Sequence, residues 1–322
     1  MELKEIISKI KEKQPKIKSV FFVGCGASKA ELYPAKYFLE TNAKNLRASL
    51  HTANEFNYAT PVSVDNSAIV ITCSLGGNTP ETVQATALAK SLGAHVIAVT
   101  HVDGSPITEK PDFVVLHRFQ ESYSAKQEKM TKVLTLAVEI LNQFEGYQHY
   151  DKMIDGLSKI YDLVDKSVTT VLPRAIKFAE QYKDAPVIYL MSSGATLEVS
   201  YAFSICLMME MQWINSGNFH DGEFFHGPFE IVDKDVPFVL LMNDGRTRPM
   251  DSRALDFLNR FGALTTVIDA KDFGLGSHIS KEVVDYFNPM LINSILRVYA
   301  EQMAIIRNHP LATRRYMWKI EY

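Results

Sequence analysis

Short, wholly apolar runs alternate along this chain with longer segments in which apolar residues recur at helical spacing. In the first half of the chain the apolar runs are predicted to be strands, and they cover residues 19–23, 67–73 and 94–100. The first two runs each lead into a turn rich in Ser or Gly and then into a helical segment. Strands without polar alternation, separated by helices, are typical of a parallel sheet that helices cover on both faces.

The second half of the chain repeats this order of elements. Its predicted strands cover residues 187–191, 236–242 and 264–269, and its helices follow the turn at 192–196 and begin near Asp251. The repetition predicts an α/β protein of two tandem domains, each a doubly wound parallel sheet flanked by helices. We place the domains at 1–150 and 151–322, because a helix breaks near residues 148–158.

The longest apolar run, residues 199–214, is interrupted by one acid, Glu210. The run is too short to span a bilayer, so we expect a buried core helix over 202–213, with Glu210 buried among its apolar neighbours. The N-terminal segment 1–18 carries isoleucines on one helical face and lacks the apolar core of a signal peptide.

Composition and net charge limit the classes of binding partner that we expect. The chain has 322 residues, of which 47% are hydrophobic, and a formal net charge of −3, which gives no reason to expect nucleic acid or an anionic membrane as a partner. Three cysteines without metal-type or paired spacing favour a reduced, cytoplasmic protein.

The turn after the second strand, residues 74–79, is the predicted ligand-binding segment. Ligands of open parallel sheets bind beyond the carboxyl ends of the strands. This turn offers hydroxyls, glycine N–H groups and a helix N-terminus, which suit a phosphate monoester without a metal. The alternative is that Thr79 and Pro80 only begin a helix.

An earlier turn, residues 24–28, has a Gly-x-Gly pattern but is predicted to bind no dinucleotide. The dinucleotide fingerprint needs a third glycine where Lys29 stands, and the Gly-Lys-Ser/Thr of a Walker loop is missing. We therefore expect neither a cofactor nor a metal.

Acid–base character is concentrated in residues 208–230. Glu210 lies in the apolar helical run, and His226 lies in a turn flanked by Gly and Pro. A carboxylate in apolar surroundings tends to have a raised pKa, and a histidine titrates near neutrality. The two are predicted to move protons at neutral pH, on a substrate that this pattern alone does not name.

The motifs at 24–28, 54–58, 74–79 and 222–228 resemble those of the sugar isomerase (SIS) superfamily. The resemblance implies that the hydroxyl-rich turn holds a sugar phosphate and that His226 takes part in ring opening. Glu210, sixteen positions earlier, would carry protons between sugar carbons. Leu75 and Gly76 replace a Ser-containing pair of the usual turn, so a backbone N–H would stand in for one hydroxyl. The turn at 243–247 is not expected to bind phosphate.

Over nearly the whole chain the sequence looks like the fructosamine-6-phosphate deglycases, through segments 33–36, 77–82, 145–150, 209–213, 222–231 and 309–322. That resemblance implies cleavage of a 6-phosphorylated ketosamine to glucose 6-phosphate and a free amino acid, without a cofactor. Glu210 and His226 would be catalytic. The substrate-binding residues would be Gly26, Ser28, Ser74, Gly76, Gly77, Asn78, Thr79, Lys129, Glu223 and Lys319.

Some of these residues have plainer interpretations. Lys129 would otherwise be a solvated lysine at a helix start, and Glu223 a residue that braces its loop. Lys319 belongs to a basic C-terminal segment with Tyr316 and Trp318; such segments are usually solvated, but aromatic residues favour packing. His220 is expected to be structural.

Two other functions stay open at this stage. An aldose–ketose phosphate isomerase, or an enzyme like glucosamine-6-phosphate synthase, would use the same acid and base. A sugar-phosphate-sensing protein would need only the phosphate turn. We expect a phosphorylated sugar–amino acid substrate, with lysine preferred as the released amino acid, and a homodimer or larger homo-oligomer. The synthase resemblance raises the further hypothesis that His226 acts across the subunit interface.

Overall fold

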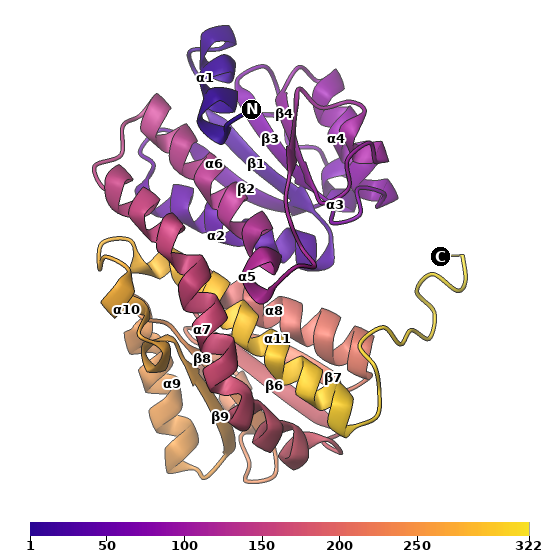
Figure 1. Cartoon of the computed structure of the whole chain (residues 1–322), viewed down its shortest axis with the longest axis vertical. Helices are drawn as coiled ribbons and strands as arrows, with labels where there is room; N and C mark the ends of the chain where they lie inside the picture. Colours follow the sequence, from indigo (N-terminus) through magenta and orange to yellow (C-terminus); the bar gives the residue numbers. More distant parts are fainter. Residues whose placement is uncertain (322) are drawn as a thin grey trace. The chain divides into compact units, whose positions relative to one another are not determined.

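The computed structural model describes residues 1–321 and divides into two compact units, Met1–Tyr161 and Asp162–Tyr322. Each unit is built on a parallel sheet with flanking helices (Figure 1). Helix α7 (Tyr150–Tyr182) begins in the first unit and ends in the second. The α/β class predicted from the sequence is confirmed.

The first unit holds a five-stranded parallel sheet in the order β2-β1-β3-β4-β5. Its strands are β1 (Ser19–Gly24), β2 (Arg47–Thr52), β3 (Ala68–Cys73), β4 (His95–Thr100) and β5 (Phe113–Leu116). Its helices are α1 (Leu3–Lys13), α2 (Gly26–Asn42), α3 (Ala53–Tyr58), α4 (Pro80–Ser91), η1 (Pro106–Thr108), α5 (Tyr123–Lys126) and α6 (Glu128–Phe144). The strand order reverses between β1 and β3, which is where open sheets of this kind bind ligands.

The second unit holds a four-stranded parallel sheet in the order β7-β6-β8-β9. Its strands are β6 (Val187–Ser192), β7 (Asn215–His220), β8 (Pro237–Met242) and β9 (Leu264–Asp269). Its helices and helical turns are η2 (Gly194–Thr196), α8 (Leu197–Ala202), η3 (Phe203–Gln212), η4 (Phe224–His226), η5 (Pro228–Ile231), α9 (Arg248–Arg260), η6 (Ala270–Phe273), α10 (Leu275–His278), η7 (Val284–Phe287) and α11 (Asn288–Ile306).

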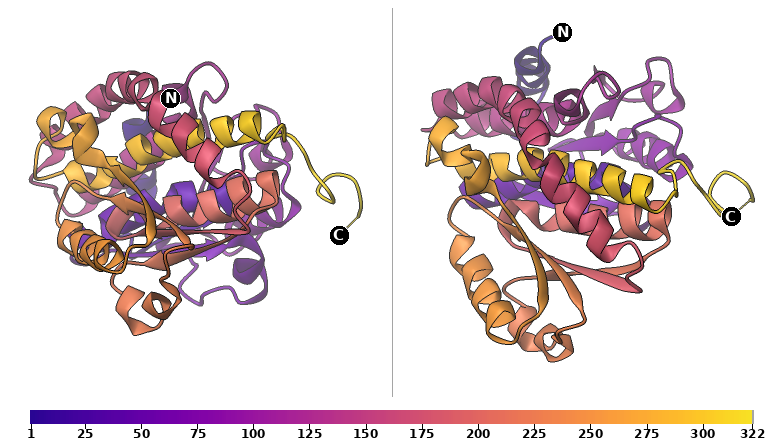
Figure 2. Two further views of the ribbon diagram at one scale, coloured as in Figure 1. Left: turned by 90° about the horizontal axis from the view of Figure 1, so that it is seen from below. Right: turned by 60° about the horizontal axis from the view of Figure 1, so that its bottom comes forward.

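The two faces of the second sheet carry different segments. The crossover from β6 to β7 runs through α8 and η3, and the crossover from β8 to β9 runs through α9. These crossovers lead in opposite directions along the sheet, so right-handed connections place α8 and α9 on opposite faces. Helix α11 lies beside α8 and η3 (Figures 1 and 2).

All six predicted strands are confirmed, as β1, β3, β4, β6, β8 and β9. Strands β1, β3 and β8 are buried at every residue, which explains their unbroken apolar sequences. Strands β2, β5 and β7 were not predicted from the sequence. These strands lie at sheet edges, and β2 and β7 have no fully buried residue, so their sequences lack an apolar run.

The predicted helix over residues 202–213 is confirmed, and residues Phe203–Gln212 within it form a π-helix. The prediction that Glu210 is buried is wrong, since 21% of its side chain is exposed. A π-helix makes its hydrogen bonds one residue further along the chain than an α-helix, so apolar neighbours in sequence take different directions. Met209, next to Glu210, is accordingly exposed.

Helix α1 is confirmed, with Ile6, Ile7 and Ile10 buried on one face. Among residues 1–321 no helix combines the length and the apolar content needed to cross a membrane.

Candidate active site

The predicted phosphate turn joins β3 to α4 at the carboxyl edge of the first sheet. Ser74 is buried directly after β3, and its backbone N–H donates to the carbonyl of Val99 at 3.2 Å. The Ser74 and Thr79 hydroxyls lie 2.9 Å apart, so the two ends of the turn are joined. Thr79 directly precedes α4, but its side chain makes no cap hydrogen bond with the helix. Its hydroxyl is therefore not used to cap α4.

The middle of the turn presents unused backbone donors. The N–H groups of Gly76, Asn78 and Thr79 donate to no acceptor within the described part of the chain. Gly76 and Asn78 are exposed, so these donors face solvent at the start of a helix. An array of free N–H groups at a helix N-terminus is a site for a phosphate or another anion.

Gly77 fixes the shape of this turn. Its φ is +69°, and a Cβ atom there would stand 1.9 Å from the Ser105 hydroxyl oxygen and 2.9 Å from that of Thr100. Glycine therefore serves both a left-handed backbone and a close approach that no other side chain permits. The carbonyl of Gly77 accepts from the N–H of Ile107, which holds the turn against the following loop.

A buried lysine lies beside the other predicted turn, residues 24–28, which joins β1 to α2. Lys129 is only 2% exposed, and its ammonium donates to the Ser28 hydroxyl at 3.3 Å and pairs with the Glu31 carboxylate. The interpretation of Lys129 as a solvated lysine is therefore wrong. Burial raises the pKa of the nearby Cys73 thiol to about 11, so this cysteine stays protonated at neutral pH.

In the second unit, Glu210 is paired with a residue that follows α11. The Nη2 atom of Arg314 lies 2.7 Å from the Glu210 Oε1 atom. Burial raises the pKa of Glu210 and the charge of Arg314 opposes that rise, with a net increase over the usual glutamate value. A carboxylate with a raised pKa is a stronger base, as general-base catalysis requires.

His226 lies on the opposite face of the second sheet from Glu210. Phe224 and Phe225, which precede it, pack with Phe257 of α9 at ring distances of 5.7 and 5.5 Å. Glu210 belongs to the π-helix on the α8 face, and no hydrogen bond or ion pair joins it to His226 within residues 1–321. The predicted acid and base are therefore not in direct contact within residues 1–321.

A buried pair of carboxyl groups holds the start of the His226 loop. Asp221 is 2% exposed and Asp251 is 0% exposed. Asp251 accepts hydrogen bonds from the Ser193 hydroxyl and, at 2.8 Å, from the Asn243 backbone N–H. Asp221 has no donor among the described residues, and burial followed by the hydrogen bond and charge of Asp251 raises its pKa. Burial and the neighbouring Asp251 carboxyl therefore favour the protonated form of Asp221.

Asp251 also joins two turns at the carboxyl edge of the second sheet, because it accepts from Ser193 after β6 and from Asn243 after β8. That the turn at 243–247 binds no phosphate stays a prediction.

We expect the Asp221→Asn protein to lose a pH dependence of stability that the unchanged protein has. The unfolded chain releases the Asp221 proton near pH 3.9, as aspartates usually do, whereas the folded protein keeps it. Because the folded state binds one proton more, the free energy of unfolding falls by up to about 1.4 kcal/mol per pH unit as pH rises, until Asp221 ionises. Asparagine donates to Asp251 without titrating, so that fall should disappear.

Urea unfolding between pH 5 and 8 measures this slope. Asp256→Asn, an exposed change on the same helix as Asp251, is the matched control and should keep the slope of the unchanged protein. Equal slopes in the Asp221→Asn and unchanged proteins would contradict the protonated pair.

The remaining predicted residues make no hydrogen bond or ion pair with Glu210 within residues 1–321. Glu223 is exposed, and its backbone carbonyl, not its carboxylate, accepts from the His226 N–H at 2.9 Å. Lys319 is exposed in the segment after α11, where Trp318 is 78% exposed and the Arg314 guanidinium lies 5.1 Å from its ring centroid. The His220 ring accepts from the Gly222 N–H at 2.9 Å, in keeping with a structural role.

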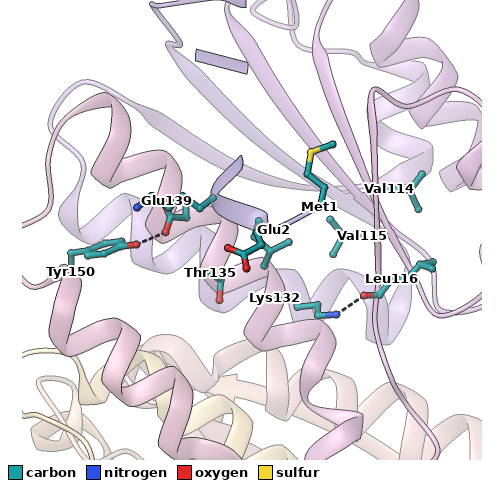
Figure 3. Close-up of a pocket in the computed structure, with 11 residues that line it drawn as sticks. Met1, Glu2, Val114, Val115, Leu116, Lys132, Thr135, Glu139 and Tyr150 are labelled. Atoms are coloured by element: carbon teal, nitrogen blue, oxygen red, sulfur yellow. Dashed lines mark hydrogen bonds between the residues drawn. The ribbon is translucent and has the colours of Figure 1, made fainter. Parts of the chain in front are cut away.

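The first unit also contains a cavity of about 670 Å³ that is lined by other residues than the predicted sites (Figure 3). It lies between the N-terminus, β5 and α6, and Tyr150 donates to the Glu139 carboxylate at its edge. No predicted site residue lines it. Within residues 1–321 no cluster of three or more His, Cys, Asp or Glu side chains is arranged to hold a metal ion.

Comparison with known proteins relates these features to a family. A family model described as the SIS domain matches residues 15–144. The chain is 40% identical over 306 residues to fructosamine deglycase FrlB of Bacillus subtilis, covering 95% of this chain and 93% of that protein. It is 25% identical over 300 residues to the fructoselysine 6-phosphate deglycase of Escherichia coli, covering 93% and 85% of the two chains.

Solved structures of related proteins are similar to this chain as well. A crystal structure from Salmonella typhimurium, described as a candidate phosphosugar isomerase, has a TM-score of 0.96 and 42% identity, covering 99% of this chain and 96% of that one. The C-terminal domain of glucosamine-fructose-6-phosphate aminotransferase from Francisella tularensis has a TM-score of 0.80 at 18% identity, covering 96% and 93%, and shares the fold.

Proposed function

Because the chain belongs to the fructosamine deglycase family of SIS-domain enzymes, we propose that it cleaves a 6-phosphorylated Amadori ketosamine to glucose 6-phosphate and a free amino acid. The observation that carries the proposal is the partly buried Glu210, whose raised pKa suits a base that removes a proton from carbon. We also propose that both units are SIS domains and that the first holds the phosphate.

The phosphate is assigned to the turn between β3 and α4. The unused N–H groups of Gly76, Asn78 and Thr79 and the hydroxyls of Ser74 and Thr79 match the acceptor oxygens of a phosphate monoester. Gly26 and Ser28 belong to the adjacent turn, where the ammonium of Lys129 donates to the Ser28 hydroxyl and pairs with Glu31. These groups position the substrate and leave the chemistry to other side chains.

The chemistry needs one base and one acid. In the open-chain ketosamine, Glu210 would take a proton from C1, while the electron pair of that bond forms the C1=C2 double bond and the C2 oxygen gains a proton. Return of a proton to C2 leaves a C1 imine. Water adds to C1, the C–N bond breaks, and the aldehyde of glucose 6-phosphate and the free amine result. His226 would protonate and deprotonate the ring and carbonyl oxygens.

We propose that the active form is a homodimer or larger, with His226 acting on the substrate held beside Glu210 of the other copy. The support is the placement of the two residues on opposite faces of one sheet, joined by no contact within the described chain. A closed, two-fold symmetric assembly would build two equivalent sites from such halves.

We expect glucose 6-phosphate to be released from 6-phosphorylated fructoselysine or 6-phosphorylated fructose-asparagine, as followed with a coupled assay. The same ketosamines without phosphate should be turned over with kcat/KM at least about 100-fold lower, because charge-assisted hydrogen bonds to the phosphate are lost. Ser74→Ala combined with Thr79→Val should raise KM for the phosphorylated substrates alone.

Equal kcat/KM with and without phosphate would contradict the phosphate assignment. Interconversion of free aldose and ketose phosphates without any amine release would indicate an isomerase instead. Binding without turnover would indicate a sensing protein.

A further inference from the structure

A cavity of about 430 Å³ lies beside Glu210, between the end of η3 and the segment after α11. Volumes of this order hold small-molecule ligands. Its charged lining consists of Glu210, Arg314 and Arg315, and its apolar lining includes Trp213 and Tyr316. The cavity therefore combines one acid already paired, two arginines and aromatic surface.

The segment after α11 is anchored to the end of the π-helix. The Gln212 side-chain amide donates to the carbonyl of His309 at 2.8 Å, and the ring of Trp213 packs edge-on to that of His309 at 4.6 Å. Trp213 has a φ of 57°, the left-handed conformation that non-glycine residues seldom adopt. This turn places the Trp213 ring against the segment rather than along the helix.

The two arginines of the cavity differ in burial and in their binding partners. Arg314 is buried, pairs with Glu210, and donates from Nη1 to the carbonyls of Leu311 and Thr313 at 2.8 and 2.9 Å. Arg315 is exposed and has no carboxylate partner within residues 1–321. Its guanidinium lies 4.3 Å above the Trp213 ring centroid.

Stacking on an aromatic ring leaves the edge of a guanidinium free. The N–H groups of arginine point outward in the plane of the group and match the two oxygens of a carboxylate. Because the Arg315 guanidinium already packs on the Trp213 ring, less side-chain freedom is lost when an anion binds. Arg315 is thus prepared for a planar anion at the entrance of the cavity.

We propose that Arg315 binds the carboxylate of the amino acid portion of the ketosamine, an inference that rests on the proposed function. If Glu210 takes the proton from C1, then the nitrogen bonded to C1 and the amino acid beyond it extend into the space next to Glu210. The cavity occupies that space. Arg315 supplies the unpaired positive charge there, and Trp213 and Tyr316 supply apolar surface for the amino acid side chain.

The test compares two 6-phosphorylated ketosamines of one amino acid, with a free carboxylate or with the carboxamide in its place. The unchanged protein should prefer the carboxylate by about 10- to 100-fold in kcat/KM, the size of a charge-assisted pair. Arg315→Gln should bring the ratio close to one by lowering turnover of the carboxylate substrate and leaving that of the carboxamide unchanged. Arg315→Lys should keep a smaller preference, since it keeps the charge but loses the planar group.

Lys281→Gln removes one exposed positive charge elsewhere in the second unit and should leave the ratio as it is. Turnover of both substrates with the same ratio in the Arg315→Gln and unchanged proteins would overturn this inference and leave the deglycase function intact. Turnover of neither substrate by the unchanged protein would overturn the proposed function and this inference with it.

Discussion

Glu210→Gln is expected to lower kcat by roughly 100-fold or more, the usual contribution of a general base. Glutamine keeps an oxygen that can accept the hydrogen bond from Arg314, so the variant should fold and bind substrate normally. The loss should appear in kcat with little change in KM, because the residue acts on the reacting carbon.

Isotope incorporation distinguishes this role from a structural one. In heavy water the unchanged protein should place deuterium at C2 of glucose 6-phosphate, whereas Glu210→Gln should not. Glu180→Gln, an exposed change on α7, is the matched control and should incorporate deuterium normally. A Glu210→Gln protein that keeps more than about a tenth of the unchanged kcat would contradict the assignment. The base would then be sought at Glu223, the carboxylate nearest to His226 in sequence.

Mixing two inactive variants is expected to restore activity. Glu210→Gln and His226→Asn chains each damage one half of a site, so neither homodimer should work. If each site takes Glu210 from one copy and His226 from another, a mixed dimer has one intact site. With random pairing in a two-fold dimer, roughly a quarter of the unchanged activity should return.

The measurement requires mixed dimers that are shown to form, for example by two affinity tags on the two variants. A double variant carrying both changes in one chain, mixed with unchanged protein in the same way, controls for simple dilution. Mixed dimers that form but stay inactive would contradict the shared site and leave the chemical roles of the two residues untouched.

The central strands were predictable from the sequence because both of their faces are buried. Strands β1 and β3 are apolar at almost every position, a pattern typical of strands buried on both faces. Strands β2 and β7 have polar sequences and partly exposed faces, and only their pairing with β1 and β6 makes them strands. Local composition does not contain that information.

The candidate site likewise has features that local sequence predicts and features that only the tertiary fold creates. The phosphate turn is a local feature, since a strand, a Gly-containing loop and a helix start follow one another in sequence. The partner of Glu210 is Arg314, which is distant in sequence, and no local pattern predicts this pairing. The pairing of Asp221 with Asp251 likewise depends on the tertiary fold. The π-helix was missed because its apolar residues suit an α-helix equally well.

Because Glu210 is paired with a residue beyond α11, the enzyme can lose activity while its fold stays intact. The core of the second unit is complete without the segment after α11, whose residues Tyr316, Trp318 and Ile320 are exposed. Exposed segments of this kind are where proteases cut first. A cut at Ala312, which is exposed and precedes Arg314, would remove the charge partner of Glu210 while the buried core of the second unit stays whole. Ageing of the enzyme would thus be visible in its kinetics before it was visible in its stability.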